Sequence, residues 1–83
     1  MEKNLKVIIY STSACVYCRM AKDFFKKNDV MYEEFDVYSD LMAREEMIKK
    51  SGQMGVPVID INGEIFVGFD QRGLEKVLGL EKK

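Results

Sequence analysis

The order of strand-like and helix-like apolar patterns most strongly constrains the fold of this chain. Residues 5–10 form a short, nearly continuous apolar run with β-branched side chains, which is typical of a buried strand. Residues 16–28 show the spacing of an amphipathic helix, and residues 31–37 alternate like a second strand. Because a helix separates the two strands, we expect them to be parallel and joined by a right-handed crossover.

A second helix should follow the second strand. Asp40 is a suitable N-cap for a helix that runs to Lys50, and Gly52 supplies its stop signal. The apolar stripes of the first two helices are Val16, Met20, Phe24 and Phe25, and then Leu41, Met42, Met47 and Ile48. We expect the methionines of these stripes to fill gaps in the core.

The last third of the chain predicts a hairpin and a helix. Two apolar runs, residues 57–61 and 64–67, flank Asn62-Gly63, a dipeptide that favours the type I′ turn of a β-hairpin. Asp70 can cap a final helix that ends at Gly79. The predicted order is βαβαββα, an α/β fold in which helices flank a four-stranded mixed sheet.

Composition favours one globular domain spanning residues 1–83. Hydrophobic residues make up 47% of the chain and charged residues 33%, which is ordinary for a folded protein. The net charge of −1 and the scattered basic residues argue against a nucleic-acid partner. No apolar run approaches the roughly 20 residues that span a bilayer, and residues 1–6 lack the apolar core of a signal peptide. We therefore expect a cytoplasmic monomer without a membrane partner.

The two cysteines of the chain, Cys15 and Cys18, lie within four consecutive positions. They are too close together to cross-link distant parts of the fold. Closing so short a loop also constrains the unfolded chain very little, so a stabilising disulfide does not explain the spacing. The pair indicates reactivity instead.

The predicted position of the pair suits thiol chemistry. Cys15 should lie at the N-terminus of the first helix, where unpaired backbone N–H groups and the helix dipole stabilise a thiolate. Cys18 should lie about one turn further along the same face, close enough to form a disulfide. In the inferred cycle, the Cys15 thiolate attacks a substrate disulfide, and Cys18 then resolves the mixed disulfide.

Metal sites are the alternatives to redox chemistry. A structural zinc site usually needs four Cys or His ligands, whereas this chain has two cysteines and no histidine. An iron-sulfur cluster would need further thiolates from a second chain or a small thiol, so it would require a dimer that bridges the cluster through Cys15 and such a thiol. We predict no metal ligands.

Three motifs at matching positions carry a resemblance to a known family. They are Cys15-Val16-Tyr17-Cys18, Gly55-Val56-Pro57 and Val67-Gly68-Phe69-Asp70. With the strand and helix order, they resemble the glutaredoxin family over essentially the whole chain. The resemblance implies a thioredoxin-like fold and an enzyme that reduces protein disulfides or glutathione mixed disulfides. It also implies glutathione as the reducing co-substrate and no permanently bound cofactor.

The resemblance assigns roles to further residues. It implies that the peptide bond before Pro57 is cis and that the Val56 backbone pairs with the bound thiol peptide. It places Arg44 near the glycine carboxylate of glutathione, Asp70 near its γ-glutamyl end, and Tyr17 in the substrate groove. From the residues alone, Pro57 could start an edge strand, Arg44 could be a solvated charge, and Asp70 could be an ordinary helix cap.

The chain departs from the usual family pattern at three places, one of which is Val16, where the family often has proline. Thr12, which we include among the substrate-binding residues, stands three residues before Cys15, where such members commonly carry lysine. Val67-Gly68-Phe69 replaces the usual Gly-Gly-Cys stretch and resembles redoxins that take electrons from thioredoxin reductase. Thioredoxin reductase is therefore a second candidate electron donor.

Overall fold

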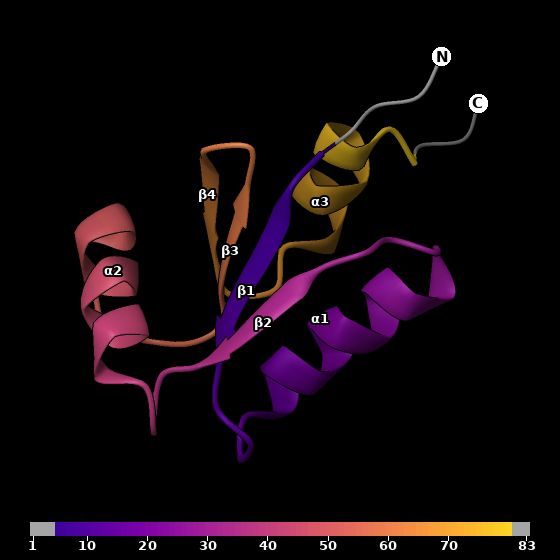
Figure 1. The fold of residues 1–83 in the computed structure, drawn as a ribbon. Coiled ribbons are helices and arrows are strands. Elements are labelled where there is room, and N and C mark those ends of the chain that lie inside the picture. Colours follow the sequence, from indigo (N-terminus) through magenta and orange to yellow (C-terminus); the bar gives the residue numbers. More distant parts are fainter. Residues whose placement is uncertain (1–4, 81–83) are drawn as a thin grey trace.

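The computed structural model describes residues 5–80 and contains the predicted elements in the predicted order (Figure 1). Their bounds are β1 Val7–Ser11, α1 Val16–Lys27, β2 Glu33–Asp36, α2 Leu41–Ser51, β3 Val58–Ile61, β4 Glu64–Val67 and α3 Gln71–Leu78. Each bound lies within two residues of its predicted position. Residues 1–4 and 81–83 of the predicted single domain lie outside the described residues.

The strands form one mixed sheet in the order β2-β1-β3-β4. β1 pairs in parallel with β2 and antiparallel with β3, and β3 pairs antiparallel with β4. Helices α1 and α3 cover one face of this sheet and α2 covers the other (Figure 1). The predicted parallel pair, hairpin and α/β class are confirmed.

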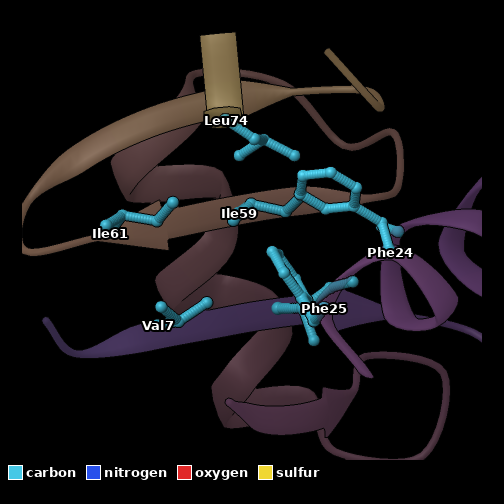
Figure 2. Packing of buried hydrophobic residues seen from close by; sticks show 8 residues of the cluster. Val7, Phe24, Phe25, Ile59, Ile61 and Leu74 are labelled. Carbon is cyan, nitrogen blue, oxygen red and sulfur yellow. The ribbon is translucent and has the colours of Figure 1, made fainter. Parts of the chain in front are cut away.

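Alternation along β1 divides the core between the two faces of the sheet. Val7 and Ile9 pack under α1 and α3, whereas Tyr10 packs under α2, because successive strand side chains point to opposite faces. Figure 2 shows Phe24 entering the first cluster from α1 and Leu74 entering it from α3. These apolar side chains are almost completely removed from water, which stabilises the fold.

A charged network joins α2 to the sheet. The Lys50 Nζ donates hydrogen bonds of 2.7 Å to the Tyr10 hydroxyl and 2.7 Å to Asp60 Oδ2. Burial alone would lower the pKa of Lys50, but the hydrogen bonds to Asp60 and Tyr10 outweigh it and raise that pKa. Burial raises the pKa of Tyr10. The network therefore holds an ammonium against a buried carboxylate and satisfies both.

The predicted turns and helix caps are confirmed. Asn62 and Gly63 have φ angles of 52° and 96°, so both central residues of the hairpin turn are left-handed, as a type I′ turn requires. Asp40 Oδ1 accepts a hydrogen bond of 3.1 Å from the Ala43 N–H, and Asp70 caps α3 in the same manner.

The prediction that Met20 and Met42 fill the core is wrong, whereas Met47 is fully buried as predicted. Met20 is 44% exposed and Met42 82% exposed. Small residues, Ala21 in α1 and Ala43 in α2, face the sheet in their place. Each exposed methionine lines an open hollow, of about 450 Å³ beside Met20 and about 430 Å³ beside Met42.

Two further stripe residues are also exposed. Val16 and Leu41 are both 63% exposed, although the stripes place them inward. Each is the first residue of its helix, where the buried face of the helix has not yet begun. None of the helices within residues 5–80 combines the length and the apolar character needed to cross a membrane.

Candidate redox site

The site begins at the turn between β1 and α1. Cys15 is the N-cap of α1, with extended backbone angles of φ −90° and ψ 117°. Its backbone N–H donates a hydrogen bond of 3.3 Å to the Thr12 carbonyl, which closes the turn. The structure therefore places Cys15 at the helix N-terminus, as predicted, and Thr12 beside it.

The Cys15 sulfur receives a backbone hydrogen bond. The Cys18 N–H donates to Cys15 Sγ at 3.1 Å, so the thiol takes the place that a Ser or Asp oxygen usually occupies in a helix cap. Cys15 is partly exposed, which leaves its sulfur accessible to another molecule. The Cys15 sulfur thus lies at the N-terminus of α1 with a backbone N–H directed at it.

Cys18 has a different environment. Its side chain has no exposed surface and lies in the first turn of α1. Burial, together with the hydrogen bond to Cys15, raises the pKa of the Cys18 thiol to about 12, although a backbone hydrogen bond from Thr12 acts in the opposite direction. Cys18 is therefore a protonated thiol at neutral pH, and Cys15 is the accessible sulfur of the pair.

The Val56-Pro57 segment forms the opposite side of the site. Because β3 runs antiparallel to β1, the start of β3 meets the end of β1. The Cys15 Sγ lies 3.9 Å from the Val56 carbonyl oxygen. The Val56-Pro57 peptide bond is cis, which confirms the prediction from the resemblance. The edge-strand interpretation of Pro57 is wrong, since β3 lies between β1 and β4.

The remaining predicted residues do not converge on the sulfur. Tyr17 is 61% exposed in the first turn of α1. Arg44 is exposed on α2, and Asp70 is exposed at the start of α3, so the sheet separates them. Among the hydrogen bonds within residues 5–80, Cys15 bonds only to Thr12, Cys18, Arg19 and Val56.

An ion pair near the site was not predicted. Lys22, one turn after Cys18, places its Nζ 2.7 Å from Glu34 Oε2, which also accepts a hydrogen bond of 3.0 Å from the Ser11 hydroxyl. The hydrogen bond between Lys22 and Glu34 raises the pKa of Lys22 and lowers that of Glu34. The ion pair links α1 to β2. The sequence does not predict it, because the helix pattern and the strand pattern do not say which helix residue lies beside which strand residue.

Gln53 was also not predicted to have a role. Its carboxamide hydrogen-bonds both peptide groups of Gly55, the residue before Val56. A lone glutamine in a loop carries no distinctive pattern. Across residues 5–80, no three His, Cys, Asp or Glu side chains are grouped so that they could hold a metal ion.

The sheet order, the helices on both faces and a Cys-x-x-Cys pair beside a cis-proline define a thioredoxin-like fold with a dithiol site. The family model described as Glutaredoxin matches residues 7–67. The chain belongs to the glutaredoxin family of thiol oxidoreductases, and the resemblance drawn from its motifs is confirmed.

Individual relatives agree with this assignment. The uncharacterized glutaredoxin-like 8.6 kDa protein in the rubredoxin operon of Clostridium pasteurianum is 40% identical over 70 residues, which cover 84% of this chain and 93% of that protein. Glutaredoxin 3 of Escherichia coli K12 is 38% identical over 64 residues, or 77% of each chain. The solved structure of the thioredoxin-like protein BC3987 is 36% identical in sequence and superposes with a TM-score of 0.83. The match covers 88% of this chain and 100% of that chain.

Proposed function

We propose that the protein is a cytoplasmic, monomeric dithiol enzyme that reduces protein disulfides or glutathione mixed disulfides, with glutathione as its reducing co-substrate. The observation that carries the proposal is the contrast between the two thiols. Cys15 is partly exposed and accepts a hydrogen bond from the Cys18 N–H, whereas the Cys18 side chain is fully buried. One sulfur is thus arranged to attack and the other to resolve.

Each step of this reaction is a thiol-disulfide exchange. The Cys15 thiolate attacks one sulfur of the substrate disulfide, forms a mixed disulfide and releases the other sulfur as a thiolate. Cys18 then loses its proton and attacks Cys15 Sγ, which releases the second substrate sulfur. The substrate disulfide is reduced to two thiols, and the enzyme is oxidised to a Cys15-Cys18 disulfide. Two molecules of glutathione return the enzyme to its dithiol form and leave as glutathione disulfide.

The surroundings of Cys15 suit a peptide-like thiol. A thiol that becomes linked to Cys15 must lie near the Val56 backbone, because the Val56 carbonyl is 3.9 Å from Cys15 Sγ. Peptide groups can pair with such an edge as an added strand. In the proposed complex, Tyr17 lines the groove, Arg44 binds the glycine carboxylate of glutathione, and Asp70 lies near its γ-glutamyl end. The exposure of Tyr17 and Arg44 supports these roles.

Thioredoxin reductase is the second candidate donor. Thr12 provides no positive charge for glutathione, and Phe69 stands where glutathione-dependent members commonly have cysteine. These two departures from the glutathione-dependent pattern keep both donors in the proposal.

The two donors can be compared directly. Oxidised protein is mixed either with glutathione, glutathione reductase and NADPH or with thioredoxin reductase and NADPH, and its rate of reduction is measured. Faster reduction by glutathione, and a slower rate for Arg44→Ala but not for Lys49→Ala, would support glutathione. Lys49 is the matched control because it is another exposed cation of α2. Reduction by thioredoxin reductase alone would assign the second donor, and no reduction by either would contradict the proposed function.

A further inference from the structure

The loop between α2 and the cis-proline is held by one side chain. The Gly55 N–H donates a hydrogen bond of 2.6 Å to Gln53 Oε1, and Gln53 Nε2 donates one of 3.0 Å to the Gly55 carbonyl. A single carboxamide therefore occupies both peptide groups of Gly55, as a neighbouring strand would. We call this pair of hydrogen bonds the Gln53 bracket.

The Gln53 bracket is anchored to the core through Ser51. The Ser51 Oγ lies 2.8 Å from the Met47 carbonyl and 3.0 Å from the Gln53 carbonyl, so its hydroxyl links the last turn of α2 to the loop. Met47 is fully buried beneath α2. The position of the loop is thus set by a helix that is packed on the sheet.

The residue that follows the bracket faces the reactive sulfur. Val56 comes directly after Gly55, and its carbonyl lies 3.9 Å from Cys15 Sγ. The paired residues of β3 begin at Val58, so the strand ladder does not use the peptide groups of Val56. Because Gly55 is bonded directly to Val56, the two hydrogen bonds with Gln53 that hold Gly55 also orient the backbone of Val56.

We propose that Gln53 is a positioning residue, whose bracket on Gly55 presents the Val56 backbone to a peptide or peptide-like thiol that becomes linked to Cys15. The proposal rests on the proposed thiol-disulfide function and extends it to a residue that does not touch the reacting atoms. A loop that is ordered before binding loses less conformational freedom when substrate arrives, so the substrate binds more tightly. Gln53 should therefore affect substrate affinity rather than thiol chemistry.

The first test compares the unmodified protein with Gln53→Ala. The probe is a peptide carrying a glutathione mixed disulfide. Loss of both hydrogen bonds should raise KM by about tenfold, with kcat changed by less than about twofold. Alkylation of Cys15 by iodoacetamide should keep its rate, because so small a reagent does not need the Val56 backbone. Exchange of the Gly55 amide hydrogen should become faster.

A double-mutant cycle supplies the control. A Cβ added at Gly55 would lie 2.8 Å from Gln53 Oε1. Among residues 5–80, apart from the two chain neighbours of Gly55, the only other atom within 4 Å of it is Gln53 Cδ. Gly55 has no positive φ, so alanine is compatible with its backbone. Gly55→Ala should therefore raise KM by displacing the carboxamide, and it should add less than about twofold in the Gln53→Ala background.

The outcomes separate this inference from the proposed function. If the fold-increases in KM of Gln53→Ala and Gly55→Ala multiply in the double variant, the two residues act independently and the role of Gln53 is overturned. A KM of Gln53→Ala within twofold of that of the unmodified protein would also overturn it. Both results leave the proposed function intact. A slower alkylation of Cys15 in Gln53→Ala would also overturn the role of Gln53, because the residue would then act on the thiol. If the unmodified protein reduces the peptide with neither donor, both proposals fail.

Discussion

The two cysteines share one helical turn but differ in exposure and in their surroundings. Cys15 caps α1 and is accessible, whereas burial raises the pKa of the Cys18 thiol to about 12. The backbone N–H of Cys18 nevertheless donates to the Cys15 sulfur. In the proposed reaction, Cys18 therefore serves the site in two ways, through its amide in the reduced protein and through its sulfur when the mixed disulfide is resolved.

Serine substitutions should separate the two roles. Cys15→Ser should abolish disulfide exchange, because the buried Cys18 cannot reach a bound substrate as a thiolate. Cys18→Ser should still form a mixed disulfide and catalyse reactions that need one thiol, since serine retains the backbone N–H. Mass spectrometry of the trapped mixed disulfide, together with the rate of disulfide reduction, measures both effects. Equal residual activity in the two variants would contradict this assignment.

At the scale of secondary-structure elements, α2 is held by its cap and by Lys50. Asp40→Ala removes the acceptor of the Ala43 N–H and should lower the free energy of unfolding by about 1 kcal/mol. Asp40→Ser preserves a capping oxygen and should recover most of the loss. Urea unfolding followed by circular dichroism measures both, and a serine variant no more stable than the alanine variant would show that capping is not the cause.

Lys50→Met should lower the free energy of unfolding more than Asp40→Ala does. Lys50→Met leaves the Asp60 carboxylate, which is 8% exposed, without its cation, and we expect the free energy of unfolding to fall by about 2–3 kcal/mol. Adding Asp60→Asn removes the buried charge and keeps the hydrogen bond from the Gly63 N–H. The double variant should therefore be more stable than Lys50→Met in urea unfolding. The reverse order would show that the charge of Asp60 is already tolerated.

The elements were predictable from sequence because their signals are local. The Asn62-Gly63 turn and the Asp40 and Asp70 caps depend on neighbouring residues, and the structure confirms them. Which face of a helix is buried depends on the partner surface, so Met20 was placed wrongly. The same holds for the site. The spacing of Cys15 and Cys18 in the sequence was enough to predict the reactive pair. The contacts of Gln53 and Lys50 could not be predicted, because they depend on how a loop and a strand are placed in the folded protein.

At the scale of the whole molecule, stability should fall on the alkaline side. The folded protein raises the pKa values of Tyr10, Cys18, Lys22 and Lys50, so these groups hold protons more tightly than in the unfolded chain. Such groups stabilise the fold fully below their unfolded pKa values and lose this effect as the pH rises. For Cys18 the loss begins near its ordinary value of 9.0 and continues towards about 12.

Unfolding in urea under reducing conditions, measured at a series of pH values, tests this expectation. The free energy of unfolding should be highest near neutral pH and should decline from about pH 9 upward. Cys18→Ala should decline less steeply, because one of the titrating groups is absent. Identical alkaline slopes for the two proteins would rule out the Cys18 contribution. On the acidic side, the lowered pKa of Glu34 adds stability above its ordinary value of 4.5, which is lost as the pH falls through the folded value.

The contact between Cys15 and Val56 joins segments 41 residues apart. During synthesis, the two thiols leave the ribosome well before Val56 does, because translation proceeds from the N-terminus. A nascent or truncated chain thus carries both sulfurs without the backbone against which a substrate would lie. The proposed binding of a peptide-like thiol along the Val56 backbone therefore becomes possible only after the C-terminal hairpin has paired with β1. Turnover of a peptide substrate should thus measure the fraction of chains that have completed folding.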